Sequence, residues 1–227
     1  MELVHEEPKL EFDIPVMFRL LRKAIQPYPP AMLFALRDQG FDSSFQILVA
    51  CIISIRTFDE VSLGAAQRLL TQASTPQAIL RMSDAQLRKL IEPCTFAPQK
   101  MQTLKKISLI AIDKYQGKLP CDYEALIDLP GVGPKCANLT LGVACHQPHI
   151  GVDIHVHRIT NRWGYVHAKT PEKTLHELEK ILPKSRWVEI NEVLVPFGKH
   201  ICLGVKPKCT QCPVRKYCRR IGVTQYQ

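Results

Sequence analysis

The sequence predicts an all-α fold, and three observations support this prediction. Apolar residues recur at helical spacing along most of the chain, beginning with Ile14, Met17, Phe18, Leu21 and Ile25. Capping boxes and prolines in helix-start positions divide the chain at short intervals. Strand signals are scarce, and we find no internal repeat and no low-complexity linker. At 227 residues, the chain is one large domain or two small ones.

Each expected helix has a physical reason to begin or end where it does. The Pro-rich stretch 26–30 ends the first helix, because proline cannot continue one. Pro98 and Pro134 suit first helical positions, where no N–H is needed. The helices expected in this way cover residues 14–25, 45–55, 57 onward, 84–91, 98–116, 122–129, 134–145, 153–163, 170–181 and 185 onward.

Polar residues just before helical runs predict the N-caps. Ser44 precedes Phe45–Ile55, a run whose near-continuous apolarity predicts burial on most sides. Capping boxes begin at Thr57 (Thr-Phe-Asp-Glu) and at Ser83 (Ser-Asp-Ala-Gln), so we expect a helix to start at each.

The chain carries an excess of basic residues. Lys and Arg number 30 and Asp and Glu 21, which gives a formal net charge of +9. This excess indicates a polyanionic partner, which would be DNA, RNA or an anionic membrane surface. No apolar run approaches the roughly 18 residues of a membrane helix, and the N-terminus lacks the pattern of a secretory signal. We therefore expect a protein that is not secreted, and that is cytoplasmic and nucleoid-associated if prokaryotic.

The chain has nine cysteines. Disulfides are not expected among them, because such a compartment keeps thiols reduced. Five are scattered along the chain, and a small buried hydrophobic side chain is the better interpretation of each. These five are Cys51, Cys94, Cys121, Cys136 and Cys145.

The other four cysteines, Cys202, Cys209, Cys212 and Cys218, follow the spacing C-x6-C-x2-C-x5-C. They lie in a Pro- and Lys-rich stretch with little apolar periodicity, which indicates a four-thiolate metal site. Structural zinc usually uses two close pairs and only one exists here, so spacing alone favours an iron–sulfur cluster slightly over zinc. Six basic residues around them are interpreted as a solvated rim and also as a phosphate-binding surface. They are Lys206, Lys208, Arg215, Lys216, Arg219 and Arg220.

A turn of Pro130, Gly131, Val132 and Gly133 joins two expected helices. Its glycines allow backbone amides to point outward, and the next helix presents its positive end to the same place. Such a turn can hold a phosphate without reading base sequence, although a G-x-G corner alone is weak evidence. Lys135 at the start of that helix is either a solvated surface lysine or an amine whose ammonium form is disfavoured, so that it acts as a nucleophile.

Asp153 suits a helix N-cap, a role worth about 1 kcal/mol. A second role is compatible with the first, because an ionised carboxylate near a sugar stabilises a developing oxocarbenium ion. Asp153 is therefore a candidate catalytic residue beside Lys135.

Together, these features resemble the endonuclease III family of DNA glycosylases, in the helix–hairpin–helix superfamily. The residues that carry the resemblance are 129–135, 152–155 and the four clustered cysteines, in the family's order and at about its spacing. The resemblance implies two helical domains with a DNA cleft between them, a six-helix domain over 40–147 and a second domain from 1–39 plus 148–227. It also implies a [4Fe-4S] cluster on the four cysteines.

The same resemblance implies a bifunctional glycosylase and abasic-site lyase that removes oxidised pyrimidines from duplex DNA in base excision repair. The damaged base is flipped out, Lys135 attacks C1′ and releases the base, and β-elimination from the Schiff base nicks the strand. Asp153 would assist the proton transfers. The related adenine glycosylases lack this lysine, so Lys135 argues against that branch. We expect a monomer, because the enzyme must enclose one duplex.

Two DNA-contacting turns depart from the family pattern. Arg56 replaces a glutamine that fills the gap left by the flipped base, and arginine can also hydrogen-bond the opposite base. Phe96 replaces a leucine wedge and would stack on a base, unless it is an ordinary core aromatic. Pro134 replaces a basic residue and Ile154 a threonine. These changes leave the chemistry intact and affect the expected substrate range.

Two rival functions stay open at this point. One is a relative whose main activity is nicking abasic sites, motivated by Arg56, Phe96 and Pro98. The other is a non-catalytic DNA-binding protein with a structural metal. Lys135 and Asp153 weigh against the second rival, since a pure binder needs neither.

Overall fold

A computed structural model describes residues 9–227 and confirms the all-helical prediction. Those residues contain no strand, and none of their helices is long and apolar enough to cross a membrane. The helices are α1 (Ile14–Ile25), α2 (Met32–Asp38), α3 (Ser44–Ser54), α4 (Asp59–Gln72), α5 (Pro76–Arg81), α6 (Asp84–Ile91), α7 (Ala97–Tyr115), α8 (Tyr123–Ile127), α9 (Pro134–Val143), α10 (Ile154–Trp163), α11 (Pro171–Ile181), the 3-10 helix η1 (Lys184–Arg186) and α12 (Glu189–His200).

The chain forms two compact units. One contains Ala31–Gly151 with helices α2 to α9, and the other contains Val152–Gln227 together with α1. Helix α2 belongs to the first unit because it packs against α3 and α4. The expected domains, 40–147 and 1–39 plus 148–227, stay a prediction.

Helix α3 is the central element of the Ala31–Gly151 unit. It packs against α2, α4, α7 and α9, and every residue from Ile47 to Ile53 is buried. This confirms the burial predicted from its apolar run. Helices α8 and α9 pack on each other as a hairpin, with Asp122 capping α8 through the Ala125 N–H (2.8 Å).

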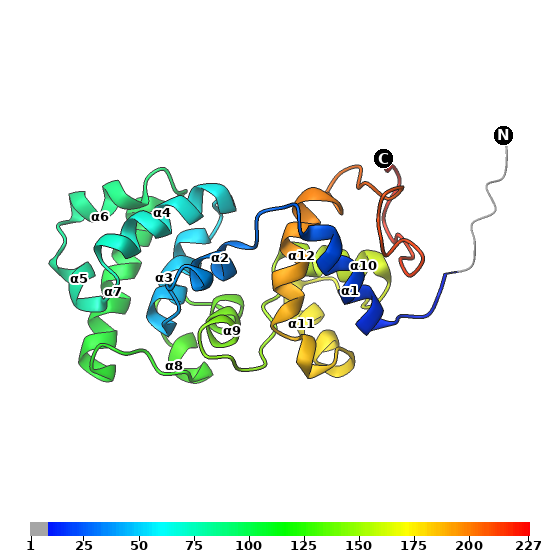
Figure 1. Ribbon diagram of the computed structural model, residues 1–227. Coiled ribbons are helices and arrows are strands. Elements are labelled where there is room, and N and C mark those ends of the chain that lie inside the picture. The colour runs from blue at the N-terminus through cyan, green and yellow to red at the C-terminus, as the bar shows by residue number, and fades with distance from the viewer. Residues whose placement is uncertain (1–8) are drawn as a thin grey trace. The chain divides into compact units, whose positions relative to one another are not determined.

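In the other unit, α12 packs against α1 and α10 (Figure 1). Phe197 of α12 is fully buried. Its neighbour Gly198 permits the close approach to α10, because a Cβ there would lie 2.4 Å from His155 Nδ1. The Arg158 guanidinium of α10 donates to the carbonyl oxygens of Gly198 (3.0 Å) and Cys202 (2.8 Å), which joins α10 to the end of α12.

Most expected helix starts are confirmed, and three are wrong. The capping box at Ser83 is present, but the cap of α3 is Ser43, while Ser44 donates to the Leu119 carbonyl (2.7 Å). Helix α4 begins at Asp59 without a side-chain cap, because the Thr57 hydroxyl is used elsewhere. Ser185 lies in η1, and α12 begins only at Glu189.

Two of the scattered cysteines correct the sequence interpretation. Cys121 and Cys145 form a disulfide, whereas Cys51, Cys94 and Cys136 are buried free thiols as expected. The compartment argument failed because it weighs only the redox environment. The α8–α9 hairpin brings together two cysteines that are 24 residues apart, and cysteine spacing gives no sign of that pairing.

Candidate DNA-binding and catalytic site

The turn between α8 and α9 has buried anchors and exposed glycine backbone. Leu129 and Val132 are buried, while Gly131 is exposed with φ +74°, in the left-handed region that favours glycine. Gly133 is the N-cap of α9 and supplies no side chain to its amides. An uncapped helix N-terminus on a glycine turn is suited to bind an anion such as a phosphate.

Lys135 is the second residue of α9, and its side chain is exposed. Its charge acts on two buried thiols, Cys51 of α3 and Cys136 of α9. The pKa of the Cys136 thiol is raised, most of all by its hydrogen bond with Cys51 and next by burial. The charge of Lys135 lowers this pKa by a smaller amount. Lys135 thus belongs to a helix whose buried face packs against α3.

Asp153 is the N-cap of α10, as expected. Its Oδ1 accepts a hydrogen bond from the Val156 N–H (2.8 Å), and the residue is half-buried. The next residue, Ile154, is 68% exposed, so this helix start is a surface feature. Lys135 belongs to the Ala31–Gly151 unit and Asp153 to the other.

Arg56 and Phe96 lie together although 40 residues separate them in the chain. Arg56 follows α3 with φ +54°, and Phe96 precedes α7 with φ +59°. The Arg56 guanidinium carbon lies 5.2 Å from the centre of the Phe96 ring, a cation–π contact. Phe96 is 47% exposed, so it is not a core aromatic. Sequence reasoning singled out both residues separately and did not foresee their contact.

A buried lysine beneath these turns escaped the sequence analysis. Lys100 of α7 is only 5% exposed, and its Nζ donates to the Ile53 carbonyl (2.6 Å) and to Thr57 Oγ1 (2.9 Å). Thr57 Oγ1 also accepts from the Thr95 N–H (3.1 Å), which explains why Thr57 does not cap α4. Burial lowers the pKa of Lys100. The only sequence signal was a lysine four residues after Phe96, on a surface-like pattern.

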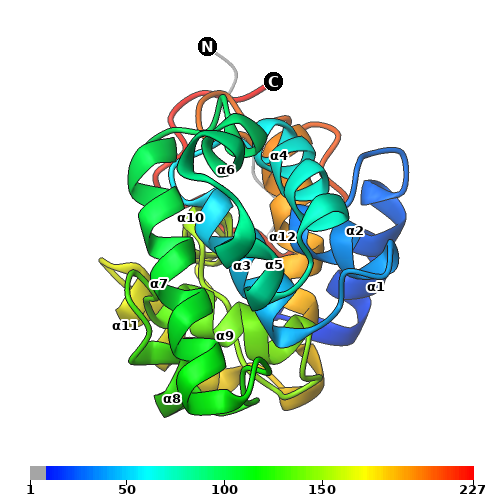
Figure 2. The ribbon, with the colours of Figure 1, turned by 90° about the vertical axis from the view of Figure 1, so that its left-hand side faces the viewer.

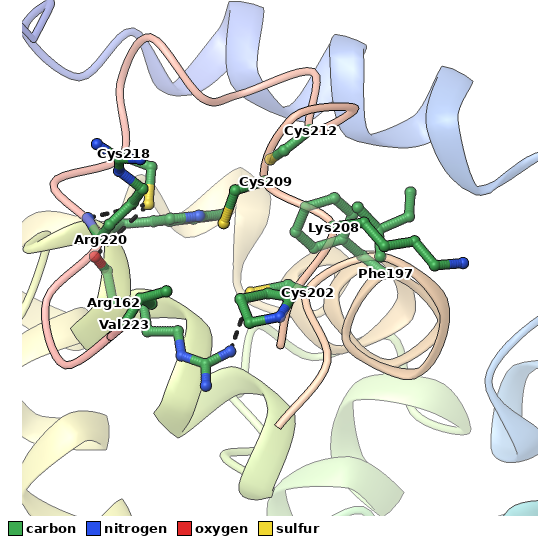
Figure 3. A pocket seen from close by; sticks show the side chains of 12 residues that line it. Arg162, Phe197, Cys202, Lys208, Cys209, Cys212, Cys218, Arg220 and Val223 are labelled. Atoms are coloured by element: carbon green, nitrogen blue, oxygen red, sulfur yellow. Dashed lines mark hydrogen bonds between the residues drawn. The ribbon is translucent and has the colours of Figure 1, made fainter. Parts of the chain in front are cut away.

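The four clustered cysteines line one pocket after α12 (Figure 3). Burial, with a smaller contribution from the other thiols of the cluster, raises the pKa of Cys212 to about 12 and that of Cys218 to about 11. Four thiolates in this pocket would repel one another, so a cationic group is needed to hold them together. Within residues 9–227 no three His, Cys, Asp or Glu side chains converge tightly enough for a single ion.

Arg162 of α10 fixes the loop that carries these cysteines. Its guanidinium donates to Cys202 Sγ (3.6 Å) and to the carbonyls of Leu203 and Gly204. Lys208 lines the same pocket and is half-buried, whereas Lys206 is exposed with φ +46°. Of these two lysines, therefore, only Lys206 is mainly exposed to solvent.

The chain is similar to known proteins over most of its length. Residues 49–184 match the family described as HhH-GPD superfamily base excision DNA repair protein. Endonuclease III of Thermotoga maritima is 36% identical over 199 residues, which cover 88% of this chain and 90% of that protein. Endonuclease III-like protein 1 of Mus musculus is 41% identical over 177 residues, which cover 77% of this chain and 59% of the mouse protein.

Solved structures show the same fold. A trapped endonuclease III–DNA covalent intermediate matches with a TM-score of 0.73 and 27% identity, covering 89% of this chain and 96% of that one. A thermostable thymine-DNA glycosylase matches with a TM-score of 0.70 and 21% identity, covering 89% of this chain and 96% of that one.

Proposed function

Because the chain belongs to the endonuclease III family, in the HhH-GPD superfamily, we propose that Lys135 is the nucleophile of its reaction. The chain is a bifunctional DNA glycosylase and abasic-site lyase of base excision repair. The observation that carries the proposal is the position of Lys135, exposed in the first turn of α9 directly after an uncapped glycine turn. A DNA phosphate bound at that turn places the adjoining sugar within the reach of the lysine.

The proposed chemistry begins with the Lys135 amine attacking C1′ of the damaged nucleotide. The C1′–N bond breaks, and the base leaves with its electron pair and takes up a proton. Opening of the sugar gives a Schiff base, and loss of a C2′ proton then expels the 3′-phosphate. The turn residues Pro130, Gly131, Val132 and Gly133 bind the backbone and carry no base-reading group, so they position the strand for any lesion.

Asp153 is proposed to act while it caps α10. The cap uses its Oδ1, and we assign the second carboxylate oxygen to the proton transfers and to the positive charge that develops on the sugar. The hydrogen bond to Val156 fixes the orientation of the carboxylate. Helix capping and catalysis are thus two uses of one side chain.

Oxidised pyrimidines in duplex DNA are the proposed substrates. Arg56 and Phe96 would enter the duplex where the base is flipped out, the ring by stacking and the guanidinium by hydrogen-bonding the opposite base. Their exposed, stacked arrangement supports this role. Lys206 is proposed to contact a phosphate, and Lys208 adds positive charge beside it.

We propose that the four clustered cysteines hold a [4Fe-4S] cluster. They surround a pocket and do not converge on one point, which suits a cluster better than a single zinc ion. When bound, the cluster supplies iron–thiolate bonds that hold the loop from Cys202 to Cys218 together. Arg162 donates to Cys202 Sγ, and the Arg220 N–H donates to Cys218 Sγ (3.4 Å). Both hydrogen bonds would stabilise the thiolates.

Borohydride trapping of Lys135→Ala beside the unaltered protein tests the proposal. Duplexes carrying an abasic site or an oxidised thymine are each mixed with both proteins. We expect a covalent adduct on both substrates with the unaltered protein and none with the variant. An adduct on the abasic site alone would indicate an enzyme narrowed to lyase activity, and an adduct on Lys135→Ala would remove the nucleophilic role of Lys135.

A further inference from the structure

We propose that Lys100 is a positioning residue for DNA recognition, which joins the Arg56 turn to the Phe96 turn through Thr57. The inference rests on the proposed function, in which Arg56 and Phe96 enter the duplex. It assigns a role to a buried polar network that neither the glycosylase chemistry nor the iron–sulfur site uses.

Each of the two turns has one residue in an unfavourable backbone conformation. Arg56 and Phe96 both have positive φ, at +54° and +59°, where a residue with a Cβ costs roughly 1–2 kcal/mol. Such conformations persist only where the surrounding structure holds them. The two turns therefore need specific support beneath them.

A single buried residue, Lys100, supports both turns. Lys100 Nζ donates to the Ile53 carbonyl in the last turn of α3 (2.6 Å) and to Thr57 Oγ1 (2.9 Å). These two acceptors lie before and after Arg56 in the chain. The backbone N–H of Lys100 donates to the Phe96 carbonyl (3.0 Å). Lys100 thus contacts both the segment that carries Arg56 and the segment that carries Phe96.

Thr57 completes the connection between the two turns. Its Oγ1 accepts from Lys100 Nζ and from the Thr95 N–H (3.1 Å), which lies next to Phe96 in the chain. The hydroxyl thereby bridges the two turns. Removing the ammonium leaves the buried Ile53 carbonyl without its donor, and removing the hydroxyl leaves the buried Lys100 ammonium without one of its acceptors. Either change frees Arg56 and Phe96 to move apart.

The proposed wedge fills the gap that a flipped base leaves in the duplex. If the Arg56 guanidinium and the Phe96 ring are already fixed together, they enter the gap in the duplex as one pre-ordered unit. Less conformational entropy of these side chains is then lost when they insert. Single-stranded DNA has no gap in a stack to fill. Loss of the network should therefore reduce activity on duplex substrates much more than on single strands.

The test measures the ratio of cleavage rates on abasic sites in duplex and in single-stranded DNA. We expect Lys100→Met and Thr57→Val to lower this ratio roughly tenfold, and Thr57→Ser, which keeps the hydroxyl, to retain most of it. Ser108→Ala is the matched control, since it removes a different buried hydrogen bond of α7, from Ser108 Oγ to the Leu104 carbonyl (2.8 Å). Its ratio should stay at that of the unaltered protein.

A second measurement reports on the wedge directly. 2-Aminopurine placed opposite the abasic site should change its fluorescence on binding of the unaltered protein, and less with Thr57→Val. If Lys100→Met fails to fold, Thr57→Val against Thr57→Ser decides the question. Equal ratios and equal fluorescence in that pair would overturn the inference, whereas absence of any Schiff-base adduct with the unaltered protein would instead overturn the proposed function.

Discussion

Helices α9 and α10 each have a proposed catalytic residue at the N-terminal end, Lys135 and Asp153, but the two helices begin in different ways. Helix α10 starts with Asp153, whose carboxylate accepts from the Val156 N–H. Helix α9 starts with Gly133, which offers no side chain to its amides, and Lys135 follows two residues later. The first start is satisfied by the protein itself, and the second is suited to bind an external anion.

This difference indicates how the two groups are placed. Asp153 is held by its own hydrogen bond, so its position is set by the helix it caps. Lys135 is exposed, and the helix beneath it is fixed instead by buried contacts to α3 and by the Cys121–Cys145 disulfide across the hairpin. The α9 start can thereby stay uncapped without depending on DNA for its shape.

After loss of Lys135 itself, the largest expected effect comes from Asp153→Asn. Asparagine caps a helix about as well as aspartate, so the free energy of unfolding should hardly change. Loss of the carboxylate charge should slow base release roughly 10³-fold. Single-turnover kinetics and urea unfolding measure the two quantities, and Asp153→Ala, which also loses the cap, should unfold about 1 kcal/mol more easily. Unchanged turnover with reduced stability would leave Asp153 as a cap alone.

The second prediction concerns the hairpin that carries Lys135. Replacing Cys121 and Cys145 by serine opens the covalent loop and should lower the free energy of unfolding by about 3 kcal/mol. Urea unfolding with and without reductant measures this. Reductant should destabilise the unaltered protein by a similar amount and leave the double variant unaffected. If reductant has no effect on the unaltered protein, the disulfide does not support the α9 start.

Sequence reasoning predicted what local chemistry determines. The cap at Asp153, the turn at Gly131 and Gly133 and the four clustered cysteines follow from residue type and spacing. The all-helical fold follows from the 3.6-residue periodicity and is confirmed by the structure and by its relatives.

What the sequence did not predict depends on contacts between distant segments. Lys100 and Thr57 meet across 43 residues, and Cys121 and Cys145 across 24. The capping-box pattern at Thr57 was misleading because a tertiary hydrogen bond took the hydroxyl that a local cap would use. Helices α2 and α5, of 7 and 6 residues, were not predicted.

The third prediction separates the two glycines of the α9 start. Gly131→Ala should lower the free energy of unfolding by roughly 1–2 kcal/mol, because φ is +74° and the new Cβ would lie 3.2 Å from Thr103 Cγ2. Gly133→Ala is the matched control, since its φ of −103° is ordinary and its Cβ would contact nothing within 4 Å. Equal stability losses in the two variants would contradict this account of the turn. Weaker DNA binding by Gly133→Ala at unchanged stability would indicate that a phosphate approaches that backbone.

The smallest change in stability is expected from Gly133→Ser, which would give α9 a capped start like that of α10. Gly133→Ser places a capping hydroxyl at the start of α9, where the backbone already has the extended conformation of an N-cap. The variant should be more stable by a few tenths of a kcal/mol, because serine is only slightly better than glycine at this position. It should bind duplex DNA more weakly, since the amides proposed to hold a phosphate now bind the serine oxygen. Thermal unfolding and a salt-dependent binding titration measure both effects, and DNA binding as tight as that of the unaltered protein would show that the uncapped amides do not take part.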